Sequence, residues 1–317
     1  MMAVKFTSGE APAAKGDPTD GRPHQQLARV LFTKEISPAA LVRIYEMLGR
    51  PLRGKVAVKM STGEPGGNNW LHPELIADLV KKVNGTIVEN NTAYPGRRNT
   101  VEAHWETIRE HGFPAIAPCD LLDEEGDMAI PVGEPHFQLA ENYVGSHLAR
   151  YDSILMLSHF KGHQMAGLGG ALKNMSIGVA SAHGKLRIHT VAKGKTFADS
   201  FTTPQDAWLE AMADADKSVM DYMGRENIVY ISVANRLSVD CDCNSNPAEP
   251  EMADIGIFAS TDPVAVDQAC VDAVYNSPDP GKKALIERME SKHGEHTIWA
   301  AEKLGLGLRS YQLVDIG

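Results

Sequence analysis

Short apolar runs alternate along the chain with longer segments in which apolar residues recur at helical spacing. The short runs lack polar alternation, which is typical of strands buried on both faces of a parallel sheet. The pattern therefore predicts an α/β fold with a largely parallel open sheet flanked by helices, in one or two lobes. We expect strands over 28–33, 55–60, 86–89, 154–157, 229–233 and 255–259, and helices over 38–48, 73–83, 100–111, 204–223, 263–275, 282–291 and 297–304.

Capping signals and composition set the expected boundaries. Ser37 precedes Pro38, Thr100 precedes an apolar-periodic segment, and one of residues 260–262 precedes Pro263, so each is expected to begin a helix. Residues 1–25 are rich in Gly, Pro, Ala and charge, and are expected to form a loose arm. Residues 26–317 are expected to form a single α/β domain, with the acidic, turn-rich stretch 120–135 as a hairpin outside the sheet.

Charge and composition narrow the possible partners and compartments. The 317 residues carry a formal net charge of −10, which argues against nucleic-acid binding because that needs a basic surface. No apolar stretch reaches the roughly 20 residues that span a bilayer, and the first residues lack a signal core, so we expect a cytoplasmic protein with no membrane partner. Four cysteines in so long a chain are expected to be reduced thiols.

Four loops follow predicted strands and carry polar or glycine-rich sequences. They cover residues 61–69, 90–98, 159–173 and 235–246. In open α/β sheets, ligands bind outside the carboxyl ends of the strands. We therefore expect these loops to build one pocket for a small-molecule ligand.

The loop 159–173 carries the densest chemistry. His163 is our first candidate for an acid/base residue, and His159 could assist it or bind a metal ion; alternatively one histidine packs and the other is solvated. Lys173 could pair with an anion or attach a cofactor, or simply lie on a helix surface. Gly169 and Gly170 would let the backbone approach a substrate closely, and the spacing does not match a nucleotide-binding P-loop.

Two further loops supply candidate substrate-binding residues. Arg98 could present its guanidinium to a carboxylate or phosphate, with Tyr94 and Glu64 positioning the ligand. The alternatives are a solvated arginine and residues that only make the turns.

Residues 240–243 place two thiols and two carboxylates in four positions. In an extended segment, Cys241 and Cys243 would face the same side and could bind one soft metal ion. Two ligands do not complete a tetrahedral site, so a further ligand would be needed. A buried pair of thiols without a metal is the alternative.

Motifs distributed over about residues 28–315 resemble the bacterial and archaeal family called domain of unknown function 362. They lie at 63–64, 71–74, 91–98, 104, 111–113, 159–174, 240–243, 254–267 and 305–311. Many members of that family carry ferredoxin-like modules and are labelled iron–sulfur proteins, which implies a ferredoxin-like redox partner. This chain has no Cys-x-x-Cys-x-x-Cys run.

Residues 163–178 also bear a distant resemblance to the catalytic domain of nickel-dependent lactate racemases. That resemblance implies His163 as the acid/base, Lys173 as the tether of a nickel-pincer nucleotide, and His189 or His183 as a nickel ligand. Leu168 and Gly169 depart from the aromatic residue and serine of that family's pattern.

These observations lead to two functional hypotheses. The first is an enzyme, dependent on a metal ion or metallocofactor, that acts on a small anionic organic substrate by proton or hydride transfer at the His/Lys loop. Racemase-like, isomerase-like or oxidoreductase activity would fit. The second is a metal- or iron–sulfur-binding redox accessory protein that uses Cys241 and Cys243, in which a homo-oligomer could complete the site. The sequence identifies no substrate.

Overall fold

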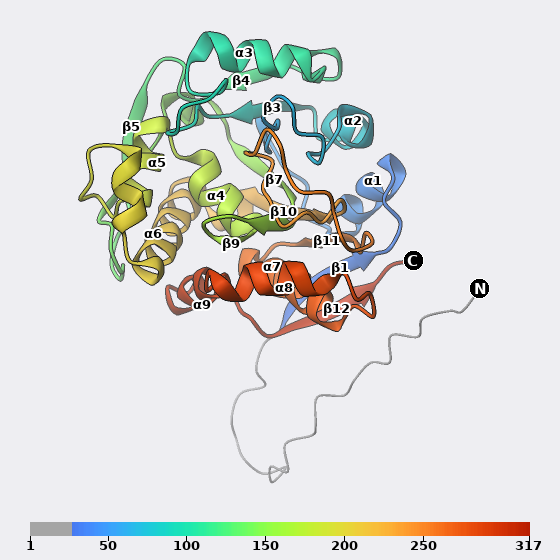
Figure 1. Ribbon diagram of the computed structural model, residues 1–317. Helices are drawn as coiled ribbons and strands as arrows, with labels where there is room; N and C mark the ends of the chain where they lie inside the picture. Colours follow the sequence, from blue (N-terminus) through green and yellow to red (C-terminus); the bar gives the residue numbers. More distant parts are fainter. Residues whose placement is uncertain (1–26) are drawn as a thin grey trace, which may run out of the picture.

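An eight-stranded sheet forms the centre of the computed structural model, which describes residues 27–317 (Figure 1). The strand order is β12-β1-β11-β10-β7-β2-β3-β4, from the bottom to the top of the view. Only β11 runs antiparallel to its neighbours, so the largely parallel α/β sheet is confirmed. The strands are β1 (Ala28–Thr33), β2 (Val56–Lys59), β3 (Gly85–Glu89), β4 (Cys119–Leu121), β7 (Ser153–His159), β10 (Ile228–Ala234), β11 (Gly256–Ser260) and β12 (Tyr311–Asp315).

The central strands are apolar throughout because both of their faces are covered. Every residue of β7 and β10 is buried. Within β7, Ile154 and Met156 join one hydrophobic core, whereas Leu155 and Leu157 join the core on the opposite face. Successive side chains of a strand point to opposite faces, so an uninterrupted apolar run is what a strand between two cores requires.

Helices form a layer on each face of the sheet. On one face, α1 (Pro38–Met47) contacts β1 and β11, α2 (Pro73–Lys82) contacts β3, and α3 (Val101–Glu110) shares their core. On the other, α4 (Ala171–Val179) and α7 (Pro263–Asn276) contact the sheet, while α6 (Gln205–Met223), α8 (Lys282–Ser291) and α9 (His296–Lys303) pack outside them. Ser37, Thr100 and Asp262 cap their helices as expected.

The sequence predicted the short elements only in part. A hairpin of β5 (Asp127–Pro131) and β6 (Glu141–Gly145) lies outside the main sheet, as expected for that region, but β4 at its start is the edge strand of the sheet. The loop after β7 contains a second hairpin, β8 (Lys161–His163) and β9 (Gly167–Gly169), and α5 (Ala182–His189) follows α4. Short 3-10 helices cover Phe113–Ala115 (η1), Ser146–Arg150 (η2), Phe197–Thr202 (η3) and Arg225–Asn227 (η4).

Two expectations concern the limits of the chain. The arm expected over residues 1–25 lies outside the described residues, so the division near residue 26 stays a prediction. Among helices of residues 27–317, none is both long and apolar enough to cross a bilayer.

Candidate functional site

The loops that follow β2, β3, β7 and β10 meet around one cavity. Its volume is about 300 Å³, within the range of small-molecule sites. The strands are parallel, so their carboxyl ends share one edge of the sheet and the loops meet there. Helices α4 and α5 and the aromatic residues of η3 complete the wall. Of the candidate residues from the sequence, those that line the cavity are Tyr94, Arg98, His159, His163, Gly169, Gly170, Lys173, His189, Cys241 and Cys243.

Glu64 does not line the cavity; it lies behind Arg98 and forms an ion pair with it. The Arg98 Nε donates to Glu64 at 2.7 Å, one terminal nitrogen donates to the Tyr94 hydroxyl at 3.0 Å, and the other lies 3.5 Å from Glu89. Burial raises the pKa of Tyr94 well above its ordinary value, so the phenol keeps its proton. Glu64 thus positions Arg98, and much of the Arg98 guanidinium is already occupied within the protein.

Glu89, at the end of β3, joins this group to Lys59, at the end of β2. The Lys59 amine donates to Glu89 at 2.9 Å, to the Met60 carbonyl at 2.6 Å and to Asn174 at 3.3 Å. Although burial alone would raise the pKa of Glu89, Lys59 and Arg98 lower it to about 2. Two cations and two carboxylates therefore offset one another's charge in and behind the wall of the cavity.

His159 belongs to a second buried network. Its Nδ1 lies 2.8 Å from Asp242 and its Nε2 lies 2.6 Å from the Asn235 carbonyl oxygen. Lys161 donates to the His159 carbonyl and is ion-paired with Asp242, both at 2.9 Å. Both nitrogens of the His159 ring face acceptors, which leaves no lone pair for the metal ion expected from the sequence.

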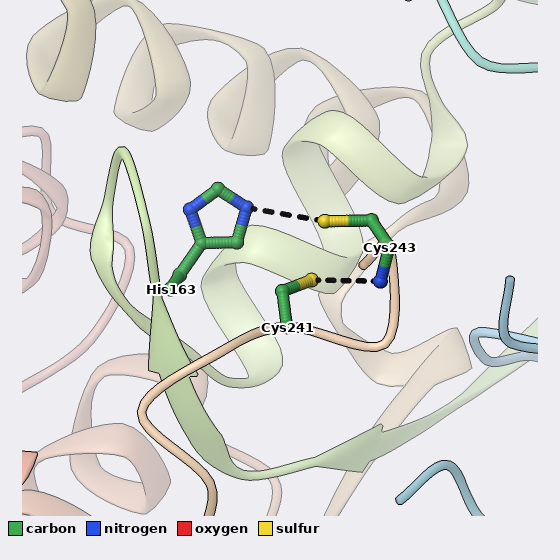
Figure 2. A group of neighbouring side chains, drawn as sticks. All are labelled: His163, Cys241 and Cys243. Atoms are coloured by element: carbon green, nitrogen blue, oxygen red, sulfur yellow. Dashed lines mark hydrogen bonds between the residues drawn. The ribbon is translucent and has the colours of Figure 1, made fainter. Parts of the chain in front are cut away.

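His163, Cys241 and Cys243 approach one another beside the turn of the β8–β9 hairpin (Figure 2). Their ligand atoms all lie within 4.8 Å of one another, which is the spacing of a possible metal site. The backbone at Gly162 makes this approach possible, because a Cβ there would lie 2.4 Å from the Val239 carbonyl oxygen. A hydrogen bond with the Cys243 side chain, followed by the positive charge of Lys173, lowers the pKa of Cys241 well below its ordinary value.

Backbone hydrogen bonds fix the tautomer of His163. The amides of Met165 and Ala166 donate to its Nδ1 at 3.1 and 2.9 Å. Nδ1 must therefore carry the lone pair, and Nε2, which faces Cys243 Sγ at 3.8 Å, carries the proton of the neutral ring. Burial and the nearby Lys173 lower the pKa of His163 to about 4, so the ring is neutral at pH 7.

His189 has the opposite tautomer. Its Nδ1 donates to the Lys185 carbonyl at 2.7 Å, which leaves the lone pair on Nε2. The ring lines the cavity and stacks on Trp208, with ring centroids 5.1 Å apart. Burial lowers the pKa of His189 to about 3, so this lone pair is available at pH 7. His183, the alternative from the sequence, is instead half-exposed and bonded to Asp127.

Lys173 lies in the first turn of α4, directly after the Gly169–Gly170 pair. Within residues 27–317, no hydrogen bond or salt bridge engages its amine, although it lines the cavity. The Asp267 carboxylate fixes the start of α4, because it accepts hydrogen bonds from the backbone amides of Ala171 at 2.7 Å and Leu172 at 2.9 Å. Gly170 is required there, since a Cβ would lie 2.4 Å from the Asp267 carboxylate.

Sequence reasoning missed four charged residues that line the cavity. Lys59 and Glu89 end two apolar strands, and charges at those positions were a usable signal because the carboxyl ends of strands carry ligand sites. Lys161 begins β8, two residues after His159 at the end of β7. Lys185 belongs to α5, a helix that the apolar pattern did not indicate.

The fold and the site define an α/β protein with a small-molecule-sized cavity at the carboxyl edge of its sheet, lined by cations, histidines and thiols. The chain belongs to the family described as Domain of unknown function (DUF362), whose model matches residues 56–272. This confirms the resemblance expected from the sequence. No curated protein matches the chain.

Among solved structures, two distant matches have 13% sequence identity each. The lactate racemase apoprotein from Thermoanaerobacterium thermosaccharolyticum has a TM-score of 0.43, with 80% of this chain and 58% of that chain covered. A protein from Thermotoga maritima has a TM-score of 0.41, with 75% of this chain and 58% of that chain covered. The matched regions thus cover less than two thirds of either solved chain.

Proposed function

We propose that the protein is an enzyme that acts on a small anionic organic substrate by proton transfer in this cavity. One observation carries the proposal. Lys173 lines the same cavity as His163 and His189, which have opposite tautomers, and within the described residues its amine has no carboxylate partner. Lys173 is partly buried, and a nearby anion stabilises a cation that is partly removed from water, so its amine favours an anionic ligand.

The two histidines supply complementary halves of a proton transfer. His189 Nε2 has the lone pair that accepts a proton from carbon or oxygen of the substrate, while Lys173 holds the anionic group. His163 Nε2 has the proton that hydrogen-bonds to a substrate oxygen as negative charge develops there. A neutral imidazole with a lowered pKa suits that role, because it donates without adding a permanent charge.

Exchange of substrate hydrogen with solvent tests this assignment. Lactate, pyruvate, malate and 2-oxoglutarate would each be incubated with the protein in D2O and followed by NMR. We expect at least one acid to exchange a carbon-bound hydrogen faster than in buffer, next to the carboxylate in lactate and malate or next to the ketone in pyruvate and 2-oxoglutarate. Loss of a general base typically costs about 10²–10⁴ in rate, so His189→Gln should lower that exchange correspondingly.

Two variants complete the test. Lys173→Met should weaken binding of the same acid, whereas Lys81→Met, on the exposed surface of α2, should change neither rate nor affinity. Exchange that stays at the buffer rate for every acid, or that survives His189→Gln in folded protein, would contradict the proposal.

A metal ion at Cys241 and Cys243 is a second candidate function, supported by the close approach of their thiols and His163. Two thiolates suit a soft metal ion. His163 does not fit as the third ligand, because its Nδ1 accepts two amide hydrogens and its Nε2 must then keep the proton. A third ligand would have to come from a cofactor, a substrate or another subunit.

Metal analysis of protein purified from its native host tests this second function. The double variant Cys241→Ser/Cys243→Ser should lose any bound metal and its absorbance, whereas Cys119→Ser, at the edge strand β4, should keep both. Equal metal content in the wild type, the double variant and Cys119→Ser would show that Cys241 and Cys243 do not bind the metal.

A further inference from the structure

Lys185 has a buried amine that, within the described residues, forms no salt bridge. It lies on α5, lines the cavity, and donates one hydrogen bond, to the Ala180 carbonyl oxygen at 2.6 Å. Lys59 and Lys161 are also buried in the wall, but each is ion-paired with a carboxylate at 2.9 Å. Within residues 27–317, no carboxylate forms a salt bridge with Lys185.

The surroundings of Lys185 favour the neutral amine. Burial is the main cause that lowers its pKa to about 7; Lys59 and Arg98 add to that effect, whereas Asp123 and Glu89 oppose it. The neutral amine, which has a lone pair, is therefore a much larger fraction of Lys185 at pH 7 than of an exposed lysine. An ordinary exposed lysine, with a pKa of about 10.4, is neutral in well under ~0.1% of molecules at that pH.

Lys185 and His189 are four residues apart on α5, so both project from one side of the helix, and both line the cavity. Lys173, on the preceding helix, supplies a cation for the same space. A nucleophilic amine, a base and an anion-binding group are thus gathered around one ligand volume.

We propose that Lys185 is a catalytic nucleophile that forms an imine with the carbonyl group of a small 2-oxo acid whose carboxylate is held by Lys173. The inference rests on the proposed function and names its substrate class. The Lys185 nitrogen attacks the carbonyl carbon, a proton moves from nitrogen to the carbonyl oxygen, and the resulting carbinolamine loses water to give C=N. One carbonyl and one amine are consumed, one imine and one water are formed, and no oxidant or reductant is needed.

The imine gives the proton transfer a chemical reason. The C=N group, once protonated, withdraws electrons from the neighbouring carbon and makes its C–H bond more acidic. His189 Nε2 then takes that proton. Because Lys185 and His189 lie on the same side of α5, the Lys185 amine can activate the carbon from which the His189 imidazole removes the proton.

Reductive trapping with pyruvate tests the inference. Pyruvate and cyanoborohydride at pH 7 would convert the imine into a stable carboxyethyl-lysine, which peptide mass analysis would locate. We expect Lys185 to be modified on the order of a hundredfold or more faster than exposed Lys81, because far more of its amine is neutral. Lys185→Met should abolish fast trapping, whereas Lys81→Met should leave it unchanged.

Binding is measured separately, so that failure of the imine and failure of the proposed function can be distinguished. Lactate has the carboxylate of pyruvate but no carbonyl, and both acids should raise the melting temperature of the wild-type protein. Stabilisation by both acids with no adduct on Lys185, or with the fast adduct on Lys173, would overturn the imine and leave the anion site. No stabilisation and no adduct would overturn both. Mapping in the wild-type protein keeps the test decisive if Lys185→Met does not fold.

Discussion

The buried carboxylate of Glu89 offers a quantitative test of how the site is held together. Glu89 accepts Lys59 Nζ at 2.9 Å and the Thr62 amide at 2.9 Å, with Arg98 at 3.5 Å, and it is 5% exposed. Glu89→Gln keeps the shape but removes the charge. Lys59 then lies buried without its carboxylate, and breaking a buried pair in this way typically costs about 3–5 kcal/mol.

The pKa of Glu89 gives a second measure of the same effect. Although burial alone would raise it, Lys59 and Arg98 lower the pKa from its ordinary value of 4.5 to about 2. Each pKa unit corresponds to ~1.36 kcal/mol, so the charged form contributes about 3 kcal/mol to stability. Because the folded-state pKa is the lower one, this contribution is present above pH 4.5 and is lost as the pH falls through about 2.

Urea unfolding at pH 7, followed by circular dichroism, measures the loss. Glu110→Gln is the matched control, because Glu110 pairs with Arg97 through two 2.8 Å hydrogen bonds but is half-exposed. An exposed pair of this kind is worth about 0.2–1 kcal/mol. We expect Glu89→Gln to lower the free energy of unfolding by about 3 kcal/mol or more. Equal losses in the two variants would refute the argument that burial makes the Glu89 network strong.

Three further predictions concern the frame of the cavity. Asp267→Ala should lower the free energy of unfolding by about 2–5 kcal/mol in urea titrations, since it leaves the amides of Ala171 and Leu172 buried without an acceptor; Asp267→Asn, which keeps one acceptor, should cost less. Gly162→Ala should lower the melting temperature more than Gly169→Ala, because the new Cβ would lie 2.4 Å from a carbonyl oxygen at Gly162, whereas at Gly169 it would lie 3.5 Å from the Lys161 side chain, an ordinary van der Waals contact; equal shifts would count against it. At pH 7 iodoacetamide should alkylate Cys241 before Cys119, because the Cys243 hydrogen bond lowers the pKa of Cys241 whereas burial raises that of Cys119 to about 11; peptide mapping would show the order.

The position of the cavity could be predicted from the sequence because it depends on the strands. Apolar runs located β2, β3, β7 and β10, and parallel strands bring their carboxyl ends to one edge. The loops after them carried the polar residues, so Tyr94, His163 and Cys241 could be assigned to the same region before any contact was known.

The second half of the cavity could not be predicted in the same way. Helix α5 is short, and four of its eight residues are charged or histidine, so its apolar periodicity is weak. It is held instead by a close tertiary contact: a Cβ on Gly184 would lie 2.0 Å from the Tyr143 carbonyl oxygen of β6. Lys185 and His189 therefore reach the cavity through packing that local sequence does not encode.

The chemical roles of the histidines depend on still finer detail. His163 and His189 are the same residue type in the same cavity, and both have a lowered pKa because of burial. They differ in what their Nδ1 atoms meet: two backbone N–H groups for His163 and a carbonyl oxygen for His189. A backbone donor forces the lone pair onto Nδ1, and a backbone acceptor forces it onto Nε2. The conformation of the β8–β9 turn therefore makes His163 Nε2 a donor, and the conformation of α5 makes His189 Nε2 an acceptor. Replacing either histidine with another polar residue would remove that donor or acceptor.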